Sequence, residues 1–357
     1  MLWHHRRKLG VIVFLVACAG LASIWITQTS AAGPSISLTT SPVSLDLHIT
    51  PGSAATQTLQ FRNNSSIALP ITTEVKIFGP YGSSGEAAIT NPGRGNMSTD
   101  WVSLSPANFV AQPNVWTAVK MTIKLPPSAN LGYYYAVVFQ PTLPSQTNTR
   151  STTIKGSNAI LVLVDTNSAN ERREVQVSSF SANKHIYEYL PVTFNITIHN
   201  GGNIFLAPTG DIFISRHSNM THSIASIPVN QGGGNVLPNS NRIFSADWAD
   251  GFPVFKQKQL DGQPLVNSKG QPVDQLVWNF SSPLSKFRFG KYYAQLALVY
   301  NDGAGNKLVT SEVSFWVIPW KLILLIILSL AALITIWSYF KKGLKKLWHR
   351  LVGKRTR

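Results

Sequence analysis

An uninterrupted apolar segment near the C-terminal end constrains this chain more than any other feature. The segment Leu322–Phe340 reads LILLIILSLAALITIWSYF, nineteen residues without a charged side chain. At 1.5 Å per residue, a helix of this length matches the hydrocarbon core of a bilayer, which is about 30 Å thick. A core helix of a soluble protein would carry a polar stripe, and this segment has none. We therefore predict a transmembrane helix over residues 320–340.

The charges around this segment predict its orientation. The chain carries 31 Lys and Arg against 15 Asp and Glu, a formal net charge of +16. The excess lies at the two ends: basic residues 6–8 precede the first apolar stretch, eight Lys and Arg lie in the tail 341–357, and all the acidic residues lie between Asp46 and Glu312. By the positive-inside rule, the tail is cytoplasmic and the bulk of the chain is extracellular. The basic balance therefore reports membrane topology, and we expect no nucleic-acid partner.

The N-terminal end has the pattern of a secretion signal. An apolar stretch, Gly10–Ile26, follows the basic leader and precedes Ser30-Ala31-Ala32, whose small residues suit a signal peptidase. We predict a signal peptide over residues 1–32, with an uncleaved signal anchor as the alternative. The only cysteine, Cys18, ends a sequence similar to a lipoprotein signal box, but the apolar stretch continues past it, which favours a residue inside a hydrophobic segment.

The segment between the two apolar ends, Gly33–Pro319, has no cysteine, so its folds must depend on buried apolar cores. Apolar and polar residues alternate with period two over residues 43–49, 119–125 and 192–198, which places one face of a strand on a core and the other in water. Turn residues separate many such short strands. We predict an all-β fold: two tandem immunoglobulin-like β-sandwiches, at 33–167 and 168–319, plus the N-terminal signal peptide and the C-terminal transmembrane helix.

Two sequence echoes indicate that the halves are diverged copies. Each echo pairs a strand-like segment of one half with one of the other: Thr58–Asn64 with Thr193–Asn200, and Gly132–Ala136 with Gly290–Ala294. The boundary is expected in the polar run 167–173, which we interpret as a stiff hinge. The segment 249–286 is rich in Gly, Pro, Lys and Gln, and we predict a hairpin-like surface insertion there. No long linker precedes Trp320, so the second sandwich should lie close to the bilayer.

Motifs that carry chemistry are absent from the sequence. It contains no HExxH, CxxC, EF-hand, phosphate-loop or nucleophile-elbow pattern, and its eight histidines are scattered. Two of them, His48 and His199, fall on predicted polar faces. The loop Asn301–Asn306 joins two predicted strands and is better explained as a hairpin turn than as a calcium loop. We expect no enzyme, no cofactor and no metal, and no individual ligand-binding residue is assigned.

Three consecutive tyrosines, Tyr133, Tyr134 and Tyr135, lie in a predicted strand. Because side chains alternate across a strand, at least one of them must point away from the core. An exposed tyrosine could stack on a sugar ring or anchor a protein interface, and the alternative is packing within the core and at the sheet edge.

Several segments together resemble one family of Gram-positive surface proteins. The segment Ile123–Tyr135 (IKLPPSANLGYYY) is similar to the strand–Pro–Gly–Tyr segment in the first domain of WxL-interacting proteins. Three others, 200–203, 208–212 and 235–242, resemble the second domain of the same family. The overall plan of signal peptide, two sandwiches, one C-terminal span and basic tail also matches. The resemblance implies a peptidoglycan-binding first domain and a second domain that binds host or surface proteins, although the insertion at 249–286 departs from the family.

These features favour a non-enzymatic, single-pass cell-membrane protein of the bacterial envelope. Its extracellular sandwiches would bind cell-wall polymer (peptidoglycan) or other secreted or surface proteins. The alternative is an extracytoplasmic, chaperone-like assembly factor that lends a strand edge to secreted or pilus-like subunits. A wall hydrolase and a purely structural spacer are further alternatives.

Overall fold

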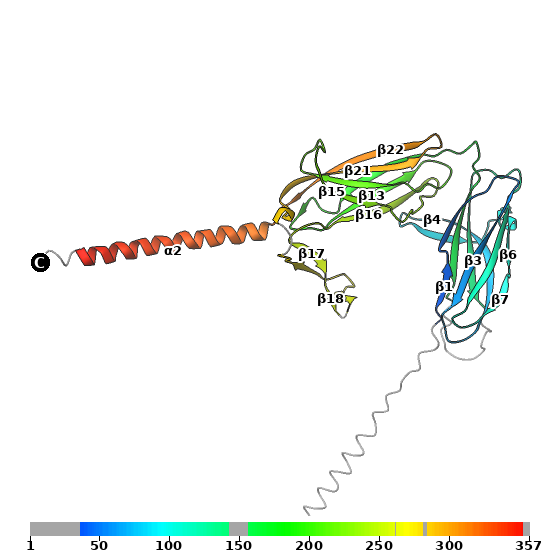
Figure 1. Cartoon of the computed structure of the whole chain (residues 1–357), viewed down its shortest axis with the longest axis horizontal. Coiled ribbons are helices and arrows are strands. Elements are labelled where there is room, and N and C mark those ends of the chain that lie inside the picture. The colour runs from blue at the N-terminus through cyan, green and yellow to red at the C-terminus, as the bar shows by residue number, and fades with distance from the viewer. Residues whose placement is uncertain (1–35, 143–155, 261, 281–283, 353–357) are drawn as a thin grey trace, which may run out of the picture.

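The computed structural model describes residues 36–142, 156–260, 262–280 and 284–352, and the predicted signal peptide lies outside these residues. Two β-sandwiches follow one another along the chain, set at an angle, and a long helix, α2, follows the second (Figure 1). The predicted all-β class, with two tandem immunoglobulin-like sandwiches and one C-terminal helix, is therefore confirmed.

The first sandwich consists of two sheets around one apolar core. One sheet has the order β1 (Leu38–Ser41), β3 (Ala54–Asn63), β8 (Trp116–Lys124) and β6 (Val102–Ser105), and a short 3-10 helix (Ser98–Trp101) precedes β6. The other has the order β2 (Ser44–His48), β10 (Asn158–Asp165), β9 (Gly132–Pro141), β4 (Leu69–Tyr81) and β5 (Glu86–Thr90), and β7 (Asn108–Ala111) also pairs with β4. Alternate residues of β8, namely Val119, Met121 and Ile123, are buried in the core, as the period-two pattern predicted.

The second sandwich has a similar topology, but among its described strands none corresponds to β6 or β7. One sheet has the order β11 (Val175–Ala182), β13 (Val192–Asn200) and β16 (Ser240–Trp248). The other has the order β12 (Ile186–Tyr187), β22 (Asn306–Val317), β21 (Gly290–Asn301), β14 (Thr209–Ser215) and β15 (Ser223–Val229). Its core holds an aromatic cluster in which the ring of Trp248 lies 5.2 Å from that of Tyr292 and 6.1 Å from that of Phe315.

Each sandwich begins with a segment that crosses from one sheet to the other. In the first, β1 pairs with β3 and β2 then pairs in parallel with β10; in the second, β11 pairs with β13 and β12 pairs in parallel with β22. The echoed sequences occupy matching strands, with Thr58–Asn63 in β3, Thr193–Asn200 in β13, and the two Gly-initiated segments at the starts of β9 and β21.

A fully buried asparagine ends the same strand in each sandwich. Asn63 Nδ2 donates to the carbonyl oxygens of Ile67 (2.7 Å) and Ala111 (3.0 Å), and its Oδ1 accepts from the Ser65 amide (3.0 Å). Asn200 Nδ2 donates to the Ile204 (2.7 Å) and Val236 (2.8 Å) carbonyls, and its Oδ1 accepts from the Gly202 amide (2.9 Å). The same side chain therefore closes the same turn in both copies.

The predicted insertion forms a small hairpin beside the start of α2. After β16, strand β17 (Val254–Gln257) pairs with β20 (Asp274–Val277), and β18 (Gln259–Leu260) pairs with β19 (Gln263–Pro264) at the far end. A 3-10 turn, Leu284–Lys286, leads back to β21. In Figure 1 the hairpin extends sideways from the end of the second sandwich at which α2 begins.

The C-terminal helix α2 comprises Trp320–Val352, and two residues separate it from the end of β22. The segment Trp320–Lys345 is long and apolar enough to cross a membrane, and its most apolar part is not buried against the rest of the chain. The helix extends twelve residues past the predicted span 320–340, so much of the predicted tail is helical.

Candidate functional site

The described residues offer no obvious centre for chemistry. Among them, no group of three or more His, Cys, Asp and Glu side chains is placed to hold a metal ion. His48 is exposed on β2, and His199 Nδ1 lies 2.8 Å from Asn241 Oδ1 on the polar face of β13, so both histidines lie on polar faces as predicted.

A charged cluster lies in the segment between the sandwiches. Arg173 contacts Glu171 (2.8 Å) and Asp165 (3.4 Å), and His48 Nδ1 lies 3.1 Å from the same Asp165. Burial by itself would raise the pKa of Asp165, but hydrogen bonds from Glu171 and the Asn167 amide, with the charges of His48 and Arg173, lower it below its ordinary value. Burial and the neighbouring Asp165 raise the pKa of Glu171. The cluster holds the end of β10 against the connecting segment.

The connecting segment is also bonded to the second sandwich. The Arg172 amide donates to Asn203 Oδ1 (2.7 Å), the Asn203 amide donates to the Arg172 carbonyl (2.9 Å), and the Gly201 amide donates to the Glu174 carbonyl (3.0 Å). These bonds join the segment to both sandwiches, and the stiffness of residues 167–173 stays a prediction.

The three tyrosines divide between the two faces of β9. Tyr135 is fully buried in the first core, and Tyr133 packs beside it and against Trp101, with ring centroids 5.0 Å apart. Tyr134 points to the opposite face, where its ring lies 5.9 Å from that of Phe78 and 6.2 Å from that of Phe205 in the second sandwich. The outward tyrosine therefore anchors an interface within the chain, and it is not available for stacking on a sugar ring.

The outer face of this sheet is apolar. Phe78, Ala136, Val138 and Leu163 form a separate buried cluster on it, to which the second sandwich contributes Phe205 and Leu237. A sheet of a two-layer sandwich usually exposes polar residues on its outer face. Here the second sandwich covers part of that face, so the two domains share a core.

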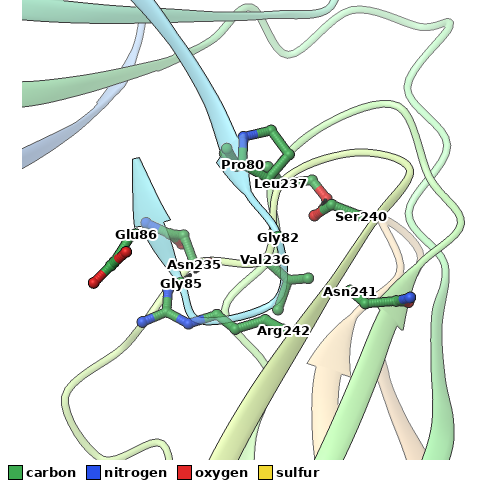
Figure 2. Close-up of a pocket in the computed structure, with 10 residues that line it drawn as sticks. All are labelled: Pro80, Gly82, Gly85, Glu86, Asn235, Val236, Leu237, Ser240, Asn241 and Arg242. Carbon is green, nitrogen blue, oxygen red and sulfur yellow. Dashed lines mark hydrogen bonds between the residues drawn. The ribbon is translucent and has the colours of Figure 1, made fainter. Parts of the chain in front are cut away.

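The turn between β4 and β5 completes the junction (Figure 2). The Ser83 carbonyl accepts a hydrogen bond from the Ile243 amide of β16 (2.8 Å). Arg242 lies along Gly85 and donates to the Asn235 carbonyl (2.6 Å), as Figure 2 shows around a small pocket. Gly85 has φ +85°, and a Cβ there would stand 2.5 Å from Arg242 Nε, so only glycine allows this approach.

The hydrogen bond to Ser83 identifies β16 as an accessible strand edge. Because the Ile243 amide points away from β13, the backbone groups of Ser245 and Asp247 face the same way along this edge. Among the described strands, none pairs with β16 on that side. The first sandwich thus occupies one end of an edge whose remainder is not paired with any described strand.

Most other sheet edges are better protected; the exception is β22, because β12 pairs with only its last two residues, Trp316 and Val317. Proteins blunt exposed edges with bulges, prolines and short strands. Edge strand β11 has an irregular register between Val177 and Ser179, β15 contains Pro228, and β2, β5, β6 and β7 have four or five residues each. By contrast, β16 has nine residues in unbroken register with β13 and contains neither proline nor bulge.

The β16 edge was not among the features singled out in the sequence. Its one sequence signal is the apolar alternation of Phe244, Ala246 and Trp248, which lies at the end of a segment whose Ser, Asn, Arg and Asp residues resemble a loop.

Comparison with known proteins adds solved structures only, because no family model and no curated protein match the chain. A chaperone–tip adhesin complex of CFA/I fimbriae biogenesis matches at 18% identity, covering 67% of this chain and 98% of that chain, with a TM-score of 0.35. The class 5 fimbriae chaperone CfaA matches at 14%, covering 77% and 99%, with a TM-score of 0.37. The E. coli chaperone DraB matches at 10%, covering 77% and 96%, with a TM-score of 0.34. At these identities, partner and chemistry must be argued from this chain's own geometry.

Proposed function

We propose that this chain is a non-enzymatic, membrane-anchored envelope protein that binds another secreted or surface protein by strand addition to the free edge of β16. The observation that carries the proposal is the nine-residue, unbroken edge of β16, occupied at Ile243 by Ser83 and open from Ser245 onward. Strand addition supplies affinity through main-chain hydrogen bonds and specificity through alternate side chains.

The junction prepares this edge for a partner. In the β4–β5 turn, the Ser83 carbonyl already accepts the Ile243 amide hydrogen, so a partner strand would continue from a fixed end, and slippage of its register past Ile243 would be blocked. On the outer face of the sheet, the side chains beside the edge are polar: Ser245 Oγ donates to Asn195 Oδ1 (3.1 Å), and Asp247 lies opposite Thr193. A partner strand with polar residues on that face would suit this surface.

Membrane anchoring by α2 is part of the same proposal. The helix carries an apolar span followed by basic residues, and only Lys321 precedes the span directly, so the positive-inside rule places Lys341 and the residues after it in the cytoplasm and both sandwiches outside. A secreted or surface partner would then meet β16 on the outer side of the membrane.

Strand addition requires a polypeptide, so the proposal favours the chaperone-like alternative from the sequence over peptidoglycan as the ligand. Peptidoglycan binding by the first sandwich stays a prediction that rests on the resemblance to WxL-interacting proteins. The experiment below therefore includes it as a rival.

Site-specific photocrosslinking in the producing cell tests the proposal. With benzoylphenylalanine at Asp247, we expect adducts with secreted or surface proteins; at Ser226, on the edge strand β15 that contains Pro228, we expect none. Adding Ser245→Pro should abolish the Asp247 adducts, because it removes an amide that faces the edge and leaves the β13 ladder intact. Retention of both the native chain and the Ser245→Pro variant on purified wall sacculi, with no protein adduct, would replace the proposal with peptidoglycan binding.

A further inference from the structure

A second group of aromatic residues lies at the end of the second sandwich where α2 begins. It joins residues of the inserted segment to residues next to β12: the rings of Tyr189 and Phe255 are 6.0 Å apart, those of Tyr189 and Trp278 are 6.3 Å apart, and that of Phe252 is 5.7 Å from Trp278. Tyr189 and Phe252 are buried beneath the others. Neither the sandwich core nor the proposed strand edge accounts for this cluster.

The outer members of the cluster face solvent to an unusual degree. Phe280 is 82% exposed and Trp278 is 41% exposed, and their rings stack with centroids 6.2 Å apart. Large aromatic rings on a surface usually mark an interaction site. Within the hairpin, Leu260 and Val266 are also exposed, and they extend the apolar surface away from the cluster.

Contacts place this surface at the start of α2. Lys321, in the first turn of the helix, donates to Glu188 Oε2 (2.8 Å). Tyr189, which follows Glu188 in the chain, contacts Trp278. The exposed indoles of Trp316 and Trp320 lie on the same end of the sandwich, immediately before and at the start of the helix. In Figure 1 the hairpin extends across the α2 axis. The plane of a membrane crossed by α2 also lies across this axis, so the hairpin would extend along the membrane surface.

We infer that the surface formed by Trp278, Phe280 and the hairpin residues 254–260 and 262–277 binds the membrane that α2 enters, with the two rings in the headgroup region of the outer leaflet. This inference rests on the proposed membrane anchoring. Tryptophan and other amphipathic rings favour the headgroup region of a bilayer. Because this surface adjoins the start of α2, a membrane crossed by α2 would lie next to it in every copy of the chain. Lys256 and Lys258, both exposed on the hairpin, would lie near anionic headgroups, which attract them.

Depth-dependent fluorescence quenching tests this contact in the full chain. In a Cys18→Ser background, a single cysteine at Phe280, Val110 or Ile334 carries an environment-sensitive dye, and the protein is placed in nanodiscs of phosphatidylcholine and phosphatidylglycerol with nitroxide lipids. Val110, which is 58% exposed on β7 of the distant first sandwich, is the matched control. We expect a shallow nitroxide to remove about half of the emission at position 280, since such surfaces insert by about 5–10 Å, and to leave that at position 110 unchanged.

The label at Ile334 separates the two claims. Quenching at 334 by a deep nitroxide, with position 280 no more quenched than 110, would overturn the surface contact and leave the membrane anchor standing. No quenching at 334 would remove the anchor and the contact with it. The dye replaces the Phe280 ring, so hydrogen exchange of residues 274–280 supplies a second measurement on the native side chain. In the native chain these amides should exchange more slowly in nanodiscs than in detergent. In Phe280→Ser the two exchange rates should be equal. An unchanged exchange rate in the native chain would also refute the contact.

Discussion

Replacing Asn200 with alanine should unfold the second sandwich more easily and leave the first untouched. The substitution removes both donors and the acceptor of a fully buried amide. Val236 O keeps its bond from the Leu206 amide (3.1 Å), so two groups lose their partner, the Ile204 carbonyl and the Gly202 amide. Each buried group left unpaired costs about 1–3 kcal/mol. Because alanine leaves room for water beside them, we expect a loss of about 3 kcal/mol in the free energy of unfolding.

Hydrogen exchange of the full chain measures this loss separately in each sandwich. For Asn200→Ala, amides of β13 should exchange about 100-fold faster while those of β3 keep their rates, and Asn63→Ala should produce the reverse pattern. Asn195→Ala is the matched control on the same strand: that side chain bonds only Ser245 Oγ on the polar face, so its effect should stay within about 0.5 kcal/mol. Equal acceleration by Asn195→Ala and Asn200→Ala would refute the argument that burial, and not residue type, decides the cost.

Three further substitutions test the junction and the helix. Gly85→Ala should strain a backbone at φ +85° by about 1 kcal/mol and press a methyl group on Arg242. The distribution of distances between spin labels on the two sandwiches should then broaden. Gly79→Ala, with no atom near its Cβ, should leave that distribution unchanged. Asp165→Asn should flatten the fall in the free energy of unfolding at acid pH. The pKa of Asp165 is lowered in the fold, so its contribution to stability is full above its ordinary pKa of 3.8 and is lost as pH falls through the lower folded pKa. Glu171, whose pKa is raised in the fold, contributes stability that is lost as pH rises. Arginine at both Leu328 and Ala332 should cost about 6 kcal/mol at the bilayer centre and release the chain from carbonate-washed membranes, whereas arginine at Trp348, past the apolar segment Trp320–Lys345, should not.

Alternation predicted the sandwiches because burial of one strand face leaves a direct trace in the sequence. Val192, Phe194, Ile196 and Ile198 alternate in the sequence and lie together in the second core. The echo between the halves includes Asn63 and Asn200, whose side chains make equivalent bonds to their turns. The long apolar helix also follows directly from composition.

The junction and the strand edge depend on pairings that no local pattern records. Consecutive buried residues in β9, from Tyr135 to Phe139, indicate a strand covered on both faces, but only the fold shows that Phe205 is part of the cover. Likewise, Ser245 and Asp247 are ordinary polar residues of an edge strand until the Ser83–Ile243 bond reveals which way their backbone groups face. The proposed binding edge therefore arises from tertiary contacts between segments about 160 residues apart in the chain.

A fixed orientation of the β16 edge follows from how the elements are joined. The last strand, β22, runs into α2 with two residues between them, and the Lys321–Glu188 pair ties the first turn of the helix to the same sandwich. At the other end, the Arg173 cluster and the Ser83–Ile243 bond hold the first sandwich against the second. With α2 placed across a membrane, neither joint leaves the edge free to rotate, so a partner strand would have to reach it at a set height above the bilayer. A partner still tethered to the same membrane would lose less translational freedom on reaching the edge at this height than a free protein would. This favours partners that emerge from the membrane or are anchored in it.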